Sequence, residues 1–212
     1  MYGAVQMARS PTVSTGSVRK RSAVAIIGSA GGIPALIELL AVLPASFPFP
    51  IIVAQHLSPT LPSTLPAVLA SRAPLAVKWA EPGERPVGGV VYVVPPGRRL
   101  VVAADGFAIS TLPLSSRSWL ACPDALLSSL AGCYGAGAVG IVLSGVLAVG
   151  IAGMRAIRSG GGVAMAQNRS SASFFDMPIG AIDLGKAELV FSPARIAEAL
   201  IVLAEEQERN AA

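Results

Sequence analysis

Residues 125–154 contain no charged side chain, and this run limits the possible folds more than any other feature of the sequence. It is long and apolar enough to form a helix across a lipid bilayer. Glycines nevertheless interrupt it every few residues, in GCYGAG, LSG and VGIAG, as they do at turns between structural elements. A buried parallel strand between two apolar helices gives the same continuous apolarity. We therefore expect a strand with flanking helices here, and not a membrane-embedded segment.

Short apolar runs alternate with helical patterns along the rest of the chain. The predicted strands are residues 22–27, 49–54 and 138–143 and the segments LAVKWA, GVVYVV, RLVVAA, GVAMAQ and AELVFS. The predicted helices are residues 34–43, 64–72, 124–134, 149–159 and 193–208, together with a short helix after Pro178. This alternation predicts an α/β fold with a doubly wound, mostly parallel sheet and helices on both of its faces. The turn-rich segments EPGERPVGG and PPGR add a small β-hairpin excursion.

The charge distribution separates an N-terminal tail from a nearly neutral folded part. The 16 Lys and Arg residues exceed the 12 Asp and Glu residues and give a net charge of +4, but part of this excess precedes the first strand. The basic residues in question are Arg9, Arg19, Lys20 and Arg21. Residues 1–22 combine them with Ser, Thr, Pro and Gly, which predicts a disordered basic tail. We expect one folded domain at residues 23–208 and a short C-terminal tail at residues 209–212.

The composition also excludes several classes of function. The later basic residues are scattered among few aromatic residues, whereas nucleic-acid binding requires a concentrated basic face with aromatic side chains for stacking. Cys122 and Cys133 lack a metal-binding spacing, so we expect no metal site, no structural disulfide and a reducing compartment. The N-terminal segment lacks the apolar core of a secretion signal. We therefore predict a cytoplasmic protein that binds neither nucleic acid nor a cofactor.

Ser29 lies in the segment IGSAGG, where the first predicted strand ends and the first helix begins. Ligands of parallel α/β sheets bind beyond the carboxyl ends of the strands, so this position suits a nucleophile. The amides of Ala30 and Gly31, near the helix N-terminus, can stabilise an oxyanion. Glycine-rich turns with a serine also serve as helix caps or phosphate cradles, and the segment matches neither GxSxG, nor GxGxxG, nor the Walker A pattern. The local sequence leaves both interpretations open.

A serine nucleophile requires a base, and His56 is the one histidine of the chain. It follows the second predicted strand in the segment IIVAQHLSPT. If the first two strands are neighbours, Ser29 and His56 share one edge of the sheet. The alternative is a histidine whose hydrogen bonds are satisfied within a loop. A triad also needs a carboxylate to orient the imidazole, and the segment after the matching strand, GIVLSGVLAVGIAGM, contains none.

Five separated segments of the chain resemble, in order and spacing, the catalytic domain of the chemotaxis protein-glutamate methylesterases of the CheB type. These segments are GSAGG, QHLSPT, VYVVPPGRRLVV, VLSGVLAVGIAGMRAIRSGGGVAMAQ and FFDMPIGAI, and the resemblance extends over residues 24–203. It implies a doubly wound sheet and a serine hydrolase that removes methyl groups from glutamate γ-methyl esters on the cytoplasmic helices of chemoreceptors. In many members of the family, the enzyme also deamidates glutamines. Ser29 is then the nucleophile and His56 the base.

The chain departs from the family pattern where the third catalytic residue is expected. The family sequence after the corresponding strand is approximately TGMGxDG, which places Val149 at the triad aspartate, Val146 at the methionine and Leu147 at the second glycine. Valine accepts no hydrogen bond from the imidazole, so the ring orientation and the tautomer of His56 are left unfixed. Loss of this acid costs serine proteases on the order of 10⁴ in rate. Arg99 also stands where a histidine is common in the family.

Two functions are compatible with these departures. The first is a methylesterase that is active or has much reduced activity. The second is a catalytically impaired relative that binds a receptor or a signalling partner through the same cleft. Asp176, in the segment FFDMP, replaces a family glycine and is a candidate for a compensating acid. Aspartate is also a preferred helix N-cap, so Asp176 can instead cap the short helix after Pro178. Many members carry a receiver domain, and from the short tail before Val24 we expect none in this chain.

Overall fold

The charge-free run folds as a helix, a buried strand and a second helix in the computed structural model, which describes residues 22–110 and 119–211. α4 (Cys122–Tyr134) is followed by a short 3-10 turn, η1 (Gly135–Gly137), and by β7 (Ala138–Val142), which is buried throughout. α5 (Ile151–Ser159) then packs against α4. None of the helices in the described ranges has both the length and the apolarity needed to cross a membrane. The predicted strand with flanking helices is confirmed, whereas the tail predicted at residues 1–22 lies, apart from its last residue, outside the described residues.

β7 lies beside the central strand of a parallel sheet. Within the described residues, seven strands form this sheet in the order β3-β4-β2-β1-β7-β8-β9, and every pairing is parallel. The other strands are β1 (Ala23–Gly28), β2 (Ile51–Gln55), β3 (Ala76–Trp79), β4 (Val90–Val93), β8 (Val163–Gln167) and β9 (Leu189–Phe191). The chain builds β2, β3 and β4 on one side of β1 and then returns to add β7, β8 and β9 on the other. The strand order therefore reverses between β1 and β7, and such a reversal is where open parallel α/β sheets bind ligands.

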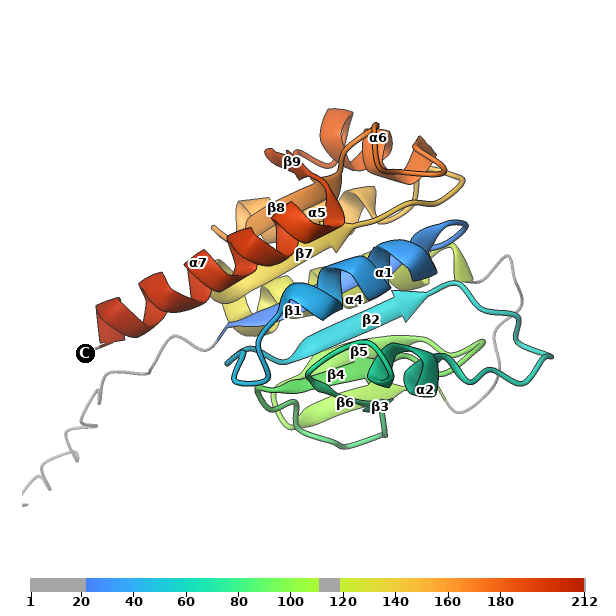
Figure 1. Ribbon diagram of the computed structural model, residues 1–212, viewed down its shortest axis with the longest axis horizontal. Coiled ribbons are helices and arrows are strands. Elements are labelled where there is room, and N and C mark those ends of the chain that lie inside the picture. Colours follow the sequence, from blue (N-terminus) through green and yellow to red (C-terminus); the bar gives the residue numbers. More distant parts are fainter. Residues whose placement is uncertain (1–21, 111–118, 212) are drawn as a thin grey trace, which may run out of the picture.

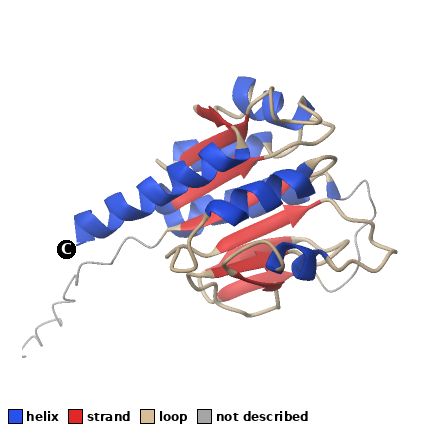
Figure 2. Cartoon of the chain, viewed as in Figure 1, coloured by secondary structure: helices blue, strands red, loops and turns tan. Residues whose placement is uncertain are grey.

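Helices cover both faces of the sheet, as Figures 1 and 2 show. The first face carries α1 (Gly32–Val42), α2 (Leu65–Ala70) and α7 (Pro193–Ala211), and the second carries α4, α5 and α6 (Asp176–Asp183). Alternate residues of each strand point into the two cores. In β1, Val24 and Ile26 pack on the first face, while Ala25 and Ile27 pack on the second. The doubly wound α/β fold predicted from the sequence is confirmed.

The hairpin is smaller than the segment in which the sequence predicted it. β3 and β4 belong to the main sheet, and only β5 (Leu100–Ala103) and β6 (Gly106–Ile109) form the antiparallel pair. The sequence analysis missed β6 because the segment GFAI is short and includes a glycine, which gives little strand signal. Ala104 and Asp105 form the turn between the two strands, and Gly106, the first residue of β6, has a φ of 138°.

Most helix ends differ from the prediction by a few residues, and two of these differences change the interpretation of a segment. α6 starts at Asp176 and not after Pro178, because a proline is tolerated in the first turn of a helix, where its missing N–H is not needed. α7 continues past Glu208 to Ala211, so most of the predicted C-terminal tail is helical. An ion pair near the end of α7, between Arg209 and Glu205 at 4.0 Å, has the i, i+4 spacing that stabilises a helix.

The loop between β7 and α5 contains two left-handed backbone conformations. Gly150, the N-cap of α5, has a φ of 81°, and a side chain there would lie 2.4 Å from Cδ1 of Ile27, so glycine is required. Leu147 has a φ of 71° and a side chain that is largely exposed. A left-handed conformation costs a non-glycine residue roughly 1–2 kcal/mol. A glycine at position 147, which the resemblance described above implies for the family, would avoid this cost.

Asp124 joins α4 to the start of α5. Its Oδ1 accepts a 2.7 Å hydrogen bond from the amide of Gly153, in the first turn of α5, where backbone amides have no partner within the helix. The two helices are closely packed at this point, because a side chain at position 153 would lie 2.5 Å from Cβ of Leu127. The carboxylate thus fixes the beginning of the helix that directly follows Val149.

Replacement of Asp124 by alanine is expected to lower the free energy of unfolding by about 1–2 kcal/mol, because it leaves the Gly153 amide without its acceptor. Urea denaturation measures this loss. Asp183→Ala is the matched control, since Asp183 is an exposed aspartate near the end of α6 and its loss should change stability by less than about 0.5 kcal/mol. Equal effects of the two substitutions would contradict the assigned role of Asp124.

Leu147→Gly is expected to raise the free energy of unfolding by up to about 1 kcal/mol, because glycine adopts a positive φ without the steric cost that leucine incurs. Thermal and urea denaturation measure the gain. Val146→Gly is the control: Val146 is the neighbouring exposed apolar residue, its φ is not positive, and glycine there only adds unfolded-state entropy. A gain from the control as large as that from Leu147→Gly would refute backbone strain as the cause.

Candidate active site

Ser29 is the first residue after β1, at the edge of the sheet where the strand order reverses. Its amide donates a 3.0 Å hydrogen bond to the carbonyl of Ser144, which follows β7, so the turn after β1 is attached to the loop after β7. Gly31 has a φ of 72° and is the N-cap of α1, and a side chain there would lie 2.6 Å from Oγ of Ser144. The glycine is thus required for both its conformation and its close approach. Ser29 is only 8% exposed, because it lies in a narrow turn.

His56 follows β2, the neighbour of β1. The last residues of the two strands, Gly28 and Gln55, are paired, and the amide of His56 donates a 3.0 Å hydrogen bond to the carbonyl of Gly28. Ser29 and His56 therefore follow directly from paired positions on neighbouring parallel strands. The expectation that they share one edge of the sheet is met. Burial lowers the pKa of His56, which favours the neutral imidazole that can accept a proton.

Gln55 ties the backbone at Ser29 to the backbone at His56. Its Nε2 donates hydrogen bonds to the carbonyl of Ser29 at 2.7 Å and to that of His56 at 3.4 Å. Its Oε1 is buried without a partner among the described residues, and it lies where side chains at Gly28 or Gly32 would collide with it. The sequence analysis missed Gln55, although a buried amide at the end of the apolar strand IIVAQ is an unusual residue for that place.

Ser144 connects three loops of the same edge. Its Oγ donates a 2.8 Å hydrogen bond to the carbonyl of Ala30, after β1, and accepts one at 3.0 Å from the amide of Phe174, in the loop after β8. Its own amide donates to Oε1 of Gln167, the last residue of β8, at 2.8 Å. Ser144 and Gln167 are almost completely buried. Both were missed, and the signal available was again a polar side chain at the end of an apolar strand.

The turn after Ser29 presents two backbone amides. Within the described ranges, neither the Ala30 amide nor the Gly31 amide donates a hydrogen bond to a protein acceptor. Both lie at the N-terminus of α1, where unpaired N–H groups and the helix dipole attract negative charge. An oxyanion that forms on a carbonyl attacked by Ser29 is the kind of group that such amides stabilise.

Val149 is half-buried and packs against the core on the second face of the sheet. It precedes Gly150 at the end of the loop after β7, so it belongs to the same sheet edge as Ser29 and His56. Its side chain offers no hydrogen-bond acceptor. Among the described residues, the imidazole of His56 has no hydrogen-bond partner, and burial is the cause of its pKa shift.

Asp176 is exposed and is the first residue of α6. The N-cap is Phe175, and no side-chain hydrogen bond caps the helix, so the interpretation of Asp176 as its N-cap is wrong. The physical reason is the earlier start of the helix, which places Asp176 inside the first turn. The part of the chain that the structure describes contains no ion pair or hydrogen bond between Asp176 and His56. Arg99, where the sequence analysis expects a histidine in the family, is exposed, and its backbone forms hydrogen bonds with Ser110, which follows β6.

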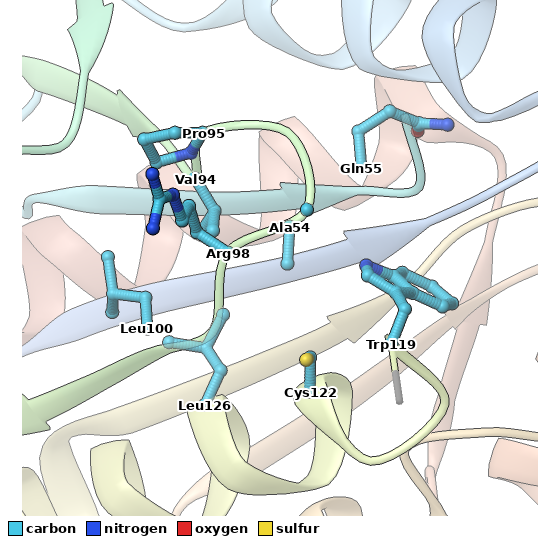
Figure 3. Close-up of a pocket in the computed structure, with 10 residues that line it drawn as sticks. Ala54, Gln55, Val94, Pro95, Arg98, Leu100, Trp119, Cys122 and Leu126 are labelled. Carbon is cyan, nitrogen blue, oxygen red and sulfur yellow. The ribbon is translucent and has the colours of Figure 1, made fainter. Parts of the chain in front are cut away.

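A small pocket lies next to the site, on the second face of the sheet (Figure 3). Its lining comes from the ends of β2 and β4, the turn before β5 and the start of α4, and includes Gln55, Arg98, Trp119 and Cys122. Burial raises the pKa of the Cys122 thiol, which makes it a poor nucleophile. Within residues 22–110 and 119–211, no group of three His, Cys, Asp or Glu residues could hold a metal ion.

Comparison with known proteins identifies the family to which the chain is similar. Residues 24–200 match the family model described as CheB methylesterase. The chain is 37% identical over 191 residues to protein-glutamate methylesterase/protein-glutamine glutaminase 3 of Anaeromyxobacter dehalogenans, a match that covers 90% of this chain and 56% of the relative. It is 33% identical over 183 residues to protein-glutamate methylesterase/protein-glutamine glutaminase 1 of Carboxydothermus hydrogenoformans, covering 84% of this chain and 54% of the relative. The chain thus spans about half the length of these curated relatives.

The fold matches a solved structure of the same family. The crystal structure of the Thermotoga maritima CheB methylesterase catalytic domain superposes with a TM-score of 0.79 at 29% sequence identity, and the match covers 86% of this chain and 98% of that one. This coverage agrees with the resemblance in the motifs around Ser29 and His56. The chain belongs to the CheB methylesterase family.

Proposed function

We propose that residues 23–208 form a serine hydrolase domain that removes methyl groups from glutamate γ-methyl esters of chemoreceptors, with glutamine deamidation as a second reaction. The observation that carries the proposal is the position of Ser29 and His56, which follow paired residues of neighbouring parallel strands at the reversal of strand order. The names of the curated relatives supply both activities. The proposed substrate segments are the cytoplasmic helices of methylated receptors, which implies a cytoplasmic location.

The proposed reaction uses an acyl-enzyme intermediate. His56 accepts the proton of Ser29 Oγ while this oxygen attacks the ester carbonyl, and the amides of Ala30 and Gly31 stabilise the resulting oxyanion. The C–O bond to the methoxy group then breaks, and the imidazolium returns its proton so that methanol leaves. A water molecule, deprotonated by His56, attacks the acyl-enzyme and releases the glutamate carboxylic acid, which ionises, and the free serine. No step requires a metal or a cofactor.

Exposed apolar side chains beside the site support a protein substrate. Val146 and Leu147 lie on the loop after β7, and Phe174 lies on the loop after β8. The two loops are adjacent, because the amide of Gly145 donates a 3.1 Å hydrogen bond to the carbonyl of Phe174. Exposed apolar groups that gather in one place are typical of interaction surfaces. An amphipathic receptor helix offers the complementary apolar side chains.

A second candidate function is a binding module that has lost most of its turnover. The observation that favours it is Val149, an apolar and half-buried residue at the position where the family pattern has an aspartate. A carboxylate in this position orients the base and stabilises its charged form, and without it the rate falls on the order of 10⁴-fold in serine proteases. The same sheet edge and the exposed side chains of Val146, Leu147 and Phe174 would then hold a receptor or a signalling partner without efficient hydrolysis.

Ser29→Ala is expected to abolish methanol release from methylated receptor, because it removes the hydroxyl that follows β1 beside His56. The measurement is methanol released per enzyme under single-turnover conditions, which detects slow reactions. Ser58→Ala is the matched control, since Ser58 is an exposed serine two residues after His56 and should leave the rate unchanged. Equal methanol release by the wild type and Ser29→Ala would contradict the nucleophile assignment. Absence of release from the wild type, with retained receptor binding, would favour the binding module.

Val149→Asp is expected to raise kcat by about tenfold or more, because it restores an acceptor for the imidazole N–H. It should also change the pH profile. Burial lowers the pKa of His56 in the wild type. As the pH decreases, kcat/KM should therefore begin to fall only at pH values below the usual titration range of histidine. A carboxylate beside the ring raises this pKa and moves the acid limb to higher pH. Val149→Asn, similar in size but uncharged, should not produce that shift.

A folded Val149→Asp variant without an increase in kcat would show that the residue at position 149 is not the only cause of reduced turnover. Leu147 would then be the next residue to test. The same outcome would also give weight to Asp176 as a compensating acid. Asp176→Asn tests that proposal directly, because a compensating carboxylate requires that the wild-type rate fall when the charge is removed. An unaltered rate would dismiss Asp176 from the mechanism.

A further inference from the structure

The imidazole of His56 lies against the indole of Trp119. The two ring centroids are 4.2 Å apart and the ring planes are inclined by 20°, which is a stacked arrangement. Trp119 comes from the segment that leads into α4, so it approaches His56 from a part of the chain far from β2 in sequence. Its side chain is held firmly, because the residue is only 7% exposed.

The surroundings of Trp119 explain why the indole is a rigid support. It forms one wall of the pocket in Figure 3, opposite side chains from the ends of β2 and β4 and close to the start of α4. Other buried apolar residues that line this pocket, among them Ala54, Val94 and Leu126, belong to the core of the second face. An aromatic ring packed in this way loses little further freedom when a second ring stacks on it.

The backbone of His56 is fixed while its ring lacks a polar partner. The amide of His56 bonds the carbonyl of Gly28, and its carbonyl receives the long hydrogen bond from Gln55. By contrast, in the described part of the chain no side chain or backbone group makes a hydrogen bond to the imidazole. The contact that restricts the ring plane is therefore the stack on Trp119.

We infer that Trp119 is the positioning residue for His56 and performs part of the role of the absent triad aspartate. This inference rests on the proposed function, in which His56 is the base. The stack holds the plane of the ring at the sheet edge shared with Ser29. The face of the indole is also electronegative, and a cation that lies within about 6 Å of its centroid is attracted to it. The imidazolium formed during acylation is therefore stabilised by the same contact, although the stack does not select the tautomer as a carboxylate would.

The charged groups around this pair do not account for such stabilisation. Arg98 and Cys122 line the pocket with Trp119. The guanidinium of Arg98 donates a 3.0 Å hydrogen bond to the carbonyl of Ser110, and the Cys122 thiol has a pKa raised by burial. Neither group carries the negative charge that would stabilise an imidazolium. Burial lowers the pKa of His56, and in the described residues no carboxylate opposes this shift.

Nuclear magnetic resonance of the free protein tests the inference without any assay of activity. Because the chain contains one histidine, the ring protons of His56 give a single set of signals. In the wild type these signals should be shifted upfield by the ring current of Trp119. In Trp119→Leu the upfield shift should disappear, and the pKa of His56 read from the titration should fall by about half a pH unit, because leucine retains apolar bulk but has no π face. Trp119→Phe should lie between the two.

The control is the other tryptophan of the chain. Trp79 lies in β3 and packs on the first face of the sheet, away from the pocket, so Trp79→Phe should leave the signals and the pKa of His56 unchanged. Wild-type ring protons at ordinary positions would overturn the inference even if no variant folds. An unchanged or raised pKa in a folded Trp119→Leu variant would overturn it as well.

Kinetics then separates this inference from the proposed function. If both hold, Trp119→Leu lowers kcat for methanol release about tenfold with little change in KM, because Trp119 acts through His56 and not on the substrate. If the wild type releases no methanol while the ring-current shift and the change in pKa are present, the proposed hydrolase activity fails and the assignment of Trp119 to the orientation of His56 stands. A loss confined to KM would assign Trp119 to substrate binding and would overturn the inference.

Discussion

The parallel pairing of β1 with β2 on one side and β7 on the other is the constraint on which the rest of this molecule depends. β1 is buried along its whole length and contributes side chains to both cores. A strand in this position must be apolar along its length. The first polar side chain, that of Ser29, therefore comes directly after the strand. The register then decides which residues meet: the pairing of Gly28 with Gln55 puts Ser29 beside His56. The candidate site is thus a direct product of strand register.

The layered fold was accessible from the sequence because its signals are local and repeated. Apolar β-branched runs and helical patterns alternate along the chain, and glycines mark the ends of elements in the charge-free run. Where local signals were weak, prediction failed. The strand β6 is too short to show a pattern. α6 begins before Pro178 because a proline in the first turn of a helix breaks no hydrogen bond within the helix.

The candidate site was only partly accessible in the same way. Ser29 and His56 were found because strand ends in parallel sheets attract function and because the chain has a single histidine. Gln55, Ser144 and Gln167 were missed, although they hold the site together, because their role lies in contacts between residues far apart in sequence. Trp119 was missed for the same reason. No local pattern predicts that the segment before α4 contacts the residue after β2.

The position of Ser144 has a consequence for how a substrate is received. One buried hydroxyl bonds the turn after β1 and the loop after β8, while its own backbone belongs to the loop after β7. These three segments are therefore coupled and have few independent motions. A site formed by coupled segments is preorganised, so binding there costs the protein little conformational entropy. For the proposed receptor substrates, discrimination between segments would then depend on how well their shape matches a fixed surface.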